Sequence, residues 1–356
     1  MPEEKSIFYA SNIQDDLKSL KNLLIYAVKC KASCVLLTNV ITPQISDADN
    51  SSYQHAIQFI KRGFSAQDDF QDIKQYINTF KSDESDHIYG KSANRIIEII
   101  DESSKKLKDQ VDSTLRLLKA CEVPVRIIPG QNENVDLLSK LNPEIREFYL
   151  NVETCSLDGF KILGIGGLNS INESVPIQFQ DNEYYAGGED AKNYLIGLFK
   201  QSVDIFVSFA PIQYKTDTGE ENLFRPLVNE YLPGNIILTS QSLKDNFDFL
   251  DKTATNSTLL RGGNFSNLGK GPFNIFWKMN YIDKKLNGIQ PYQLRGDYAI
   301  SIESLYKEKE VVVGDLDIPQ SVHVEKDINN KSDFYDTGQD LISKDVKTEL
   351  LDITLE

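Results

Sequence analysis

The sequence has little histidine, cysteine or tryptophan, with three, four and one of each in 356 residues. The histidines are scattered at positions 55, 87 and 323, so neither a Ser-His-Asp nor a Cys-His catalytic arrangement is indicated. None of the cysteines forms a Cys-x-x-Cys pair, and we interpret them as small core residues in a reducing compartment. These cysteines are Cys30, Cys34, Cys121 and Cys155.

Long apolar runs and an excess of positive charge are absent as well. There is no N-terminal hydrophobic segment and no run of the roughly 18 apolar residues that a membrane span needs, so we expect a cytoplasmic protein. The net charge of −15 and the pI near 4.8 argue against nucleic acid as the main partner. Residues 315–356 hold eleven acids against four lysines, which is −7 of that charge, and we expect them to form a flexible acidic tail.

The most informative stretch that is present covers residues 6–43, which read as strand, helix and strand. Asp15 and Asp16 stand where a helix N-cap and first turn favour acids. Apolar residues then recur at helical spacing from Leu17 to Val28, and residues 34–37 form the continuous apolar run of a buried parallel strand. This pattern predicts an α/β fold.

Further elements follow along the chain. We expect strands at 123–128, 160–165, 203–208 and 235–238, and later β-rich runs at 257–260, 297–303 and 310–313. Residues 92–121 carry one apolar stripe at helical spacing, which predicts a single long helix within a helical insertion at 44–121. The insertion interrupts one α/β domain at 1–314.

The loops that follow the strands carry amides. In open α/β sheets, chemistry is placed at the carboxyl ends of strands, where this chain has Asn12, Gln14 and Asn39. Laid in order, the strand-end loops resemble those of the calcineurin-like metallophosphoesterase superfamily, whose five blocks carry the ligands of two metal ions. The backbone framework matches at Gly130, at Gly166-Gly167 and at the Ala-Pro that follows Phe209.

The ligands themselves are replaced. Asn12-Ile13-Gln14 stands for Asp-x-His and Thr38-Asn39 for Gly-Asp. Gly130–Glu133 occupies the place of the family's Gly-Asn-His-Asp/Glu. Phe209 occupies the place of a His, and residues 240–243 occupy the place of Gly-His-x-His. The altered positions are Asn12, Gln14, Asn39, Gln131, Asn132, Phe209, Gln241 and Leu243.

Two divalent cations about 3.5–4 Å apart need anionic ligands, a bridging carboxylate and imidazoles. Amides supply neutral oxygens only, so we expect no metal and no cofactor. The simpler interpretation of the amides is that they satisfy backbone groups of the loops, and the alternative is that they line a ligand pocket. Asp15, Asp16 and Glu133 are left as a weak carboxylate set for one hard cation, although helix-start acids explain the first two equally well.

One more candidate is Arg261, which stands beside Gly262-Gly263 and could bind an anion. The spacing is not that of a P-loop, and a turn explains it more simply. Asp15, Glu133 and Arg261 are therefore the candidate residues of any remaining cleft.

The resemblance implies a two-sheet α/β/β/α sandwich with a helical insertion. The leading hypothesis is a catalytically inactive member, a pseudoenzyme that acts as a scaffold or assembly subunit and binds a protein through residues 44–121 or the acidic tail. One alternative is a phosphoesterase with an altered metal site. Another is a sensor that binds a phosphorylated ligand in the old cleft without cleaving it.

Overall fold

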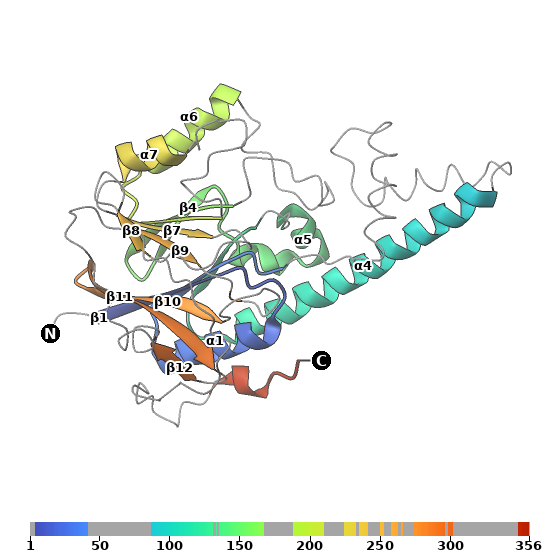
Figure 1. Ribbon diagram of the computed structural model, residues 1–356, viewed down its shortest axis with the longest axis horizontal. Helices are drawn as coiled ribbons and strands as arrows, with labels where there is room; N and C mark the ends of the chain where they lie inside the picture. The colour runs from blue at the N-terminus through green and yellow to red at the C-terminus, as the bar shows by residue number, and fades with distance from the viewer. Residues whose placement is uncertain are drawn as a thin grey trace, which may run out of the picture.

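The structure is a computed structural model. It describes residues 4–41, 87–130, 133, 135–166, 188–209, 224–232, 235–240, 250–252, 258–262, 265, 274–295, 298–301 and 348–355. Two mixed six-stranded sheets form its centre (Figure 1).

The first sheet has the strand order β12-β11-β10-β1-β2-β3. Strands β1, β2 and β3 are parallel, whereas β10, β11 and β12 join them as antiparallel neighbours. Tyr9 of β1 lies opposite Leu36 of β2, and Leu36 lies opposite Arg126 of β3, which brings the carboxyl ends of these strands to one edge. The strands are β1 (Glu4–Ser11), β2 (Cys34–Thr38), β3 (Val125–Ile128), β10 (Ile275–Ile282), β11 (Lys285–Arg295) and β12 (Tyr298–Ser301).

The second sheet has the order β4-β5-β6-β7-β9-β8. Its inner strands β5, β6, β7 and β9 are parallel, and antiparallel β4 and β8 form the two edges. The strands are β4 (Glu153–Leu157), β5 (Phe160–Ile165), β6 (Ile205–Ser208), β7 (Ile236–Ser240), β8 (Leu250–Lys252) and β9 (Thr258–Gly262).

Helices cover the outer face of each sheet (Figure 1). Helices α1 and α4 pack on the first sheet, and α6 and α7 pack on the second. The helical elements are α1 (Leu17–Lys29), α4 (His87–Ala120), α5 (Val135–Leu141), η1 (Pro143–Phe148), α6 (Gly188–Phe199), α7 (Phe224–Tyr231) and η3 (Glu349–Asp352).

Three apolar clusters fill the spaces between these layers. Beneath α1, the rings of Phe8, Tyr26 and Phe276 lie with centroids 5.1–5.8 Å apart, which fixes the helix on the first sheet. Between the sheets, Tyr9 and Trp277 pack among aliphatic side chains from both. The predicted α/β/β/α sandwich is therefore confirmed.

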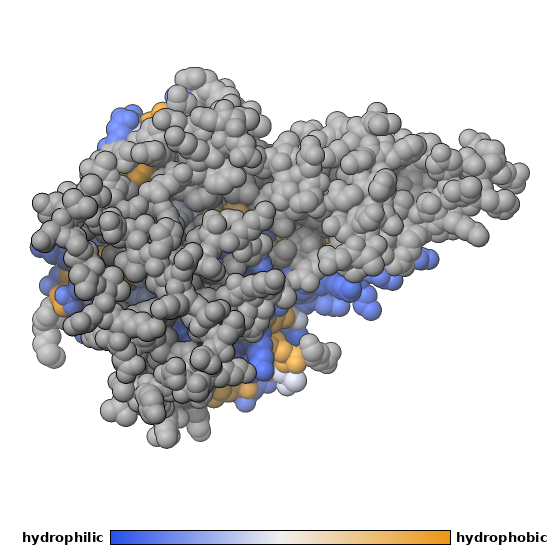
Figure 2. Space-filling model, in the orientation of Figure 1, coloured by the Kyte–Doolittle hydropathy of each residue, from blue (hydrophilic) through white to orange (hydrophobic). Residues whose placement is uncertain are grey.

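Helix α4 confirms the prediction of one long helix, which begins at His87 rather than at residue 92. Leu107, Val111 and Leu118 of its predicted stripe are buried, so the carboxyl-terminal half packs on the body. The other half extends away from the sheets, and its described surface is hydrophilic (Figures 1 and 2). The rest of the predicted insertion, residues 44–86, lies outside the described residues. No described helix has the length and apolar content to cross a bilayer.

Three expectations need correction. Residues 275–295 were not expected to be strands, yet β10 and β11 form a hairpin with β10 directly beside β1. Strand β4 lies in a stretch that the sequence left unassigned. The end of the predicted flexible tail, residues 348–355, packs on α1 and α4, because Leu350 is fully buried there. Residues 302–347, which include the β-rich run at 310–313, lie outside the described residues.

Candidate functional site

The carboxyl ends of β1, β2 and β3 bring Asn12, Asn39 and Gly130 together. Backbone bonds tie the loops to one another: the Asn12 amide donates to the Thr38 carbonyl at 3.0 Å, and the Asn39 amide to the Ile128 carbonyl at 3.2 Å. These residues and Glu133 are called the strand-end cluster below.

The two asparagines of the cluster face each other. Asn39 Nδ2 donates to Asn12 Oδ1 at 3.2 Å, and the residues are only 5% and 2% exposed. Both have left-handed backbones, with φ of 52° and 56°, and asparagine tolerates this conformation better than most residues. Two carboxylates at the same positions would repel each other out of water. The amide pair avoids this repulsion and forms a hydrogen bond instead.

Gln14 and Asp15 continue this loop in the same conformation, with φ of 48° and 62°. Their amides donate to the carbonyls of Asn39 and Val40, both at 2.9 Å, so the β1–α1 loop runs along the loop after β2. Asp16 then caps α1 by accepting from the Ser19 amide at 3.0 Å. The helix-start interpretation of Asp16 is confirmed.

Gly130 is needed because Asn39 occupies the space beside it. A Cβ at Gly130 would lie 2.2 Å from Asn39 Oδ1, and a Cβ at Gly166 would lie 2.6 Å from the Pro129 carbonyl oxygen. Contacts this short cannot occur without movement of a neighbour. Gly130 therefore allows the loops after β2 and β3 to pack closely, and Gly166 allows the end of β5 in the second sheet to approach Pro129.

Glu133 is fully buried and accepts hydrogen bonds from three parts of the chain. Its Oε1 accepts from the Val40 amide at 2.8 Å, the Ile41 amide at 2.5 Å and the Tyr149 hydroxyl at 2.9 Å. Its Oε2 accepts from the Gly130 amide at 2.6 Å. Burial outweighs these bonds and raises the pKa of Glu133 to about 7, and burial together with the nearby carboxyl raises the pKa of Tyr149.

The sequence suggested Glu133 as a residual cleft residue, but its place in the structure is different. Both oxygens are engaged by protein donors and none of the side chain is exposed. A buried carboxylate with this many donors acts as a structural link, because it satisfies backbone amides that the turning loops cannot pair with each other. Glu133 therefore holds the loops after β2 and β3 to the segment that carries Tyr149.

The strand ends of the second sheet are apolar or hydroxylated. Phe209 is half-buried against the cluster between the sheets, and its amide donates to the Ile165 carbonyl at 3.1 Å. Ser208 and Thr239, at the ends of β6 and β7, are fully buried. An aromatic ring at 209 supplies no metal ligand, and the hydroxyls are weak ones.

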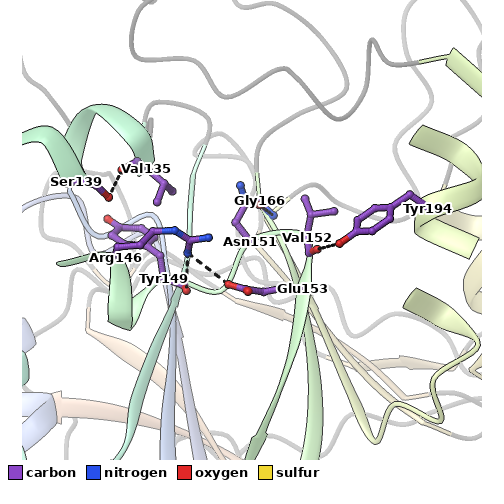
Figure 3. A network of polar contacts seen from close by, with 9 residues as sticks. All are labelled: Val135, Ser139, Arg146, Tyr149, Asn151, Val152, Glu153, Gly166 and Tyr194. Atoms are coloured by element: carbon purple, nitrogen blue, oxygen red, sulfur yellow. Dashed lines mark hydrogen bonds and ion pairs between the residues drawn. The ribbon is translucent and has the colours of Figure 1, made fainter. Parts of the chain in front are cut away.

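Sequence reasoning missed the residues that connect the two sheets beside the strand-end cluster (Figure 3). Asn151 Oδ1 accepts from the Gly166 amide at 3.0 Å, and the Leu150 amide donates to the Ile127 carbonyl at 2.8 Å. Arg146 donates to the Tyr149 carbonyl at 3.2 Å and pairs with Glu153 at 3.4 Å. No sequence signal marks Tyr149 or Asn151, because their roles depend on residues far away in the chain.

The residues described here do not fit a two-metal centre. No group of three or more His, Cys, Asp or Glu side chains placed to hold a metal occurs in the described part of the chain. His87 begins α4, while the other two histidines lie outside the described ranges. Arg261 is placed in β9 by its backbone, opposite Thr239. The remaining predicted positions, Gln131, Asn132, Gln241 and Leu243, also lie outside the described residues.

Comparison with known proteins gives similarity in structure only. No protein-family model and no curated protein sequence matches the chain. One crystal structure aligns over 83% of this chain and 100% of its own at 11% identity, with a TM-score of 0.49. The protein TT1561 of Thermus thermophilus aligns over 82% of this chain and 100% of its own at 11% identity, with a TM-score of 0.43.

The NAD nucleotidase NadN of Haemophilus influenzae aligns over 82% of this chain and 50% of its own at 10% identity, with a TM-score of 0.34. All of these similarities are distant. A shared fold does not carry a shared activity, so the chemistry of this chain depends on its own residues.

Proposed function

We propose that this chain is a catalytically inactive metallophosphoesterase-like protein that acts as a protein-binding scaffold or assembly subunit. The observation that carries the proposal is the strand-end cluster. Asn39 donates to Asn12, and both oxygens of Glu133 accept from protein groups. These side chains already have protein hydrogen-bond partners. They therefore stabilise the loops and are not left free to coordinate a metal.

Retained framework positions support descent from a metal-binding site. Gly130 and Gly166 allow the close approach of loops, and parallel strands bring these loops to one edge, as in the family that the sequence resembles. The positions that would hold the metals carry amides and an aromatic ring. We infer that the backbone of the site was kept because it closes the sandwich.

The scaffold role is supported by helix α4. It has 34 residues, which corresponds to about 50 Å, and much of it extends beyond the sheets (Figure 1). Its described outer positions include exposed Glu98, Asp101 and Glu102. The charged part of α4 that extends beyond the sheets offers contact area without disturbing the core.

Metal content tests the inactive part of the proposal. We expect purified protein that is incubated with Mn²⁺ and desalted to keep no stoichiometric metal, and to show no turnover of a chromogenic phosphodiester. Two equivalents of metal per chain, or turnover that a chelator abolishes, would support an altered phosphoesterase instead.

Reversal of the acids on α4 tests the scaffold part. The variant Glu98→Lys/Asp101→Lys/Glu102→Lys should lose a partner that co-purifies stoichiometrically with the wild-type protein. Reversal of the exposed Asp136 in α5 and Glu147 in η1 is the control and should keep that partner. If both variants keep it, α4 is not the contact surface.

The phosphorylated-ligand sensor remains a competing candidate. The hydroxyl of Thr239 is buried at the strand ends and has no hydrogen-bond partner among the described residues. A group that binds a ligand would also lack a partner before the ligand is bound. A rise in melting temperature with a nucleotide or sugar phosphate, abolished by Thr239→Val, would favour the sensor.

A further inference from the structure

The last described residues of the chain, 348–355, return to the body and lie beside α1 and α4 (Figure 1). They are called the C-terminal segment here, and the surface of α1 and α4 beneath them is called the α1–α4 face. No strand pairing joins the segment to either sheet among the described residues. Its attachment therefore depends on side chains and a few polar contacts.

One side of the segment is apolar and faces the protein. Leu350 is fully buried in the same cluster as the inner residues of α1 and α4, and Ile353 and Leu355 pack against that cluster. The neighbouring Leu351 points the other way and is 52% exposed. The segment thus contacts the rest of the protein through one apolar side, and its other side is exposed.

Polar contacts fix the register of this peptide. Lys21 Nζ of α1 donates to the Ile353 carbonyl at 2.6 Å and to the Leu351 carbonyl at 3.4 Å. The Thr348 side chain caps η3 by accepting from the Leu350 amide. A lysine at the carboxyl end of a single helical turn satisfies carbonyls that have no partner within the turn.

We propose that the α1–α4 face is a peptide-binding site whose ligand is the C-terminal segment of the same chain, bound reversibly. One fully buried leucine, two partly buried apolar residues and a few hydrogen bonds stabilise the bound state only modestly against the entropy of ordering the segment. Among the described residues the segment pairs with no strand, so its release breaks no strand pairing there. This inference does not depend on the absence of a metal site.

Reversible binding has a consequence for partners. When the segment leaves, the apolar residues of α1 and α4 beneath it become accessible. A second peptide with apolar residues at the spacing of Leu350, Ile353 and Leu355 would then compete with the chain's own segment. The segment would thereby control access to this face.

The test uses full-length protein and a fluorescent peptide of residues 346–356. Leu350→Asp removes the buried anchor, and Leu351→Asp is the matched control because its side chain is exposed. We expect circular dichroism to show that the Leu350→Asp protein stays folded. It should bind the peptide at least tenfold more tightly than the wild-type and Leu351→Asp proteins do, because their own C-terminal segments occupy the face. A peptide that carries Leu350→Asp should not bind.

Other outcomes overturn the proposal. If Leu350→Asp and the milder Leu350→Ala both prevent folding, the segment is an integral part of the core. If the folded Leu350→Asp protein binds no peptide, the face is not a peptide site. Equal binding to all three proteins would place the peptide elsewhere on the surface.

Discussion

The strand-end cluster and the C-terminal segment both join parts of the chain that are distant in sequence, but with opposite chemistry. Glu133 uses a buried carboxylate to satisfy donors from three segments. The C-terminal segment uses one buried leucine and one partly exposed lysine. Loss of a buried hydrogen-bond acceptor leaves donors unsatisfied, whereas a one-sided apolar contact can come apart into water. We therefore expect changes in the first region to unfold the domain and changes in the second to act locally.

The largest effect should come from Glu133→Ala. It leaves three buried backbone amides and the Tyr149 hydroxyl without their acceptor, and we expect a loss of about 4 kcal/mol in the free energy of unfolding. Denaturant titration measures it. Glu153→Ala removes an exposed carboxylate that pairs with Arg146 and should cost less than about 1 kcal/mol. Similar losses for both variants would show that Glu133 does not link the loops.

Replacement of the strand-end amides by the ligands that the resemblance implies should be the next most costly change. Asn12→Asp, Gln14→His and Asn39→Asp together place two carboxylates where amides are hydrogen-bonded, and we expect a loss of about 3 kcal/mol. No phosphodiesterase activity should appear in Mn²⁺, because Phe209 still supplies no ligand and a metal misplaced by about 1 Å loses roughly a hundredfold in rate. Clear turnover by the triple variant would show that the loops are still arranged for catalysis.

Gly130→Ala should disturb the same cluster through steric contact. The added Cβ would lie 2.2 Å from Asn39 Oδ1, so Asn39 must move away from Asn12, and we expect a loss of about 2 kcal/mol. The control is Gly197→Ala in α6, where a Cβ meets nothing within 4 Å. That change should leave stability unchanged or raise it by up to about 1 kcal/mol, since alanine favours the helix. Equal thermal shifts for the two variants would contradict the packing argument.

Titration of Glu133 should give an effect on stability that depends on pH. Burial raises its pKa to about 7 in the folded protein, against an ordinary value of 4.5, so the folded state binds a proton more readily than the unfolded state. This contribution to stability is fully present below about pH 4.5 and is lost as the pH rises through about 7. The stability of wild type relative to Glu133→Gln should fall across this window, by at most about 1.4 kcal/mol per pH unit. Parallel pH profiles would exclude a raised pKa.

The smallest effect is expected at the C-terminal segment. Lys21→Ala removes the donor to the Ile353 carbonyl and should cost less than about 1 kcal/mol in global stability, while hydrogen exchange at the Leu351 amide increases. Lys18→Ala on the exposed side of α1 is the control and should leave that exchange unchanged. If Lys21→Ala lowers global stability as much as Gly130→Ala does, the C-terminal segment contributes to global stability as strongly as the strand-end cluster does.

Much of the fold could be predicted from local signals. The apolar run of β2, the stripe of α1 with Asp16 at its start, and the long helix α4 all lie where periodicity and capping place them. The hairpin of β10 and β11 was missed because its two-residue turn uses Asp283 and Lys284, both at positive φ, instead of an Asn-Gly signal. The pairing of β10 with β1 brings together residues more than 250 positions apart in sequence, and no local pattern encodes it.

The candidate site divides in the same way. Sequence order identified Asn12, Asn39 and Gly130 as strand-end residues, and the register of β1, β2 and β3 brings them together. The structural role of Glu133 was missed. A carboxylate beside Asn132 resembles a metal ligand as long as the groups that donate hydrogen bonds to it are unknown. Those donors come from the loop after β2, from Gly130 and from Tyr149.

The sequence by itself determined which segments alternate between strand and helix, and which chemical groups end the strands, because periodicity and residue type are local properties of the chain. It thereby determined that amides and an aromatic ring follow the strands. Only the tertiary structure decided which donor meets which acceptor, that Glu133 is buried, and that Leu350 returns to α1 and α4. Burial and hydrogen-bond partners are relations between distant residues, and they exist only once the two sheets have packed together.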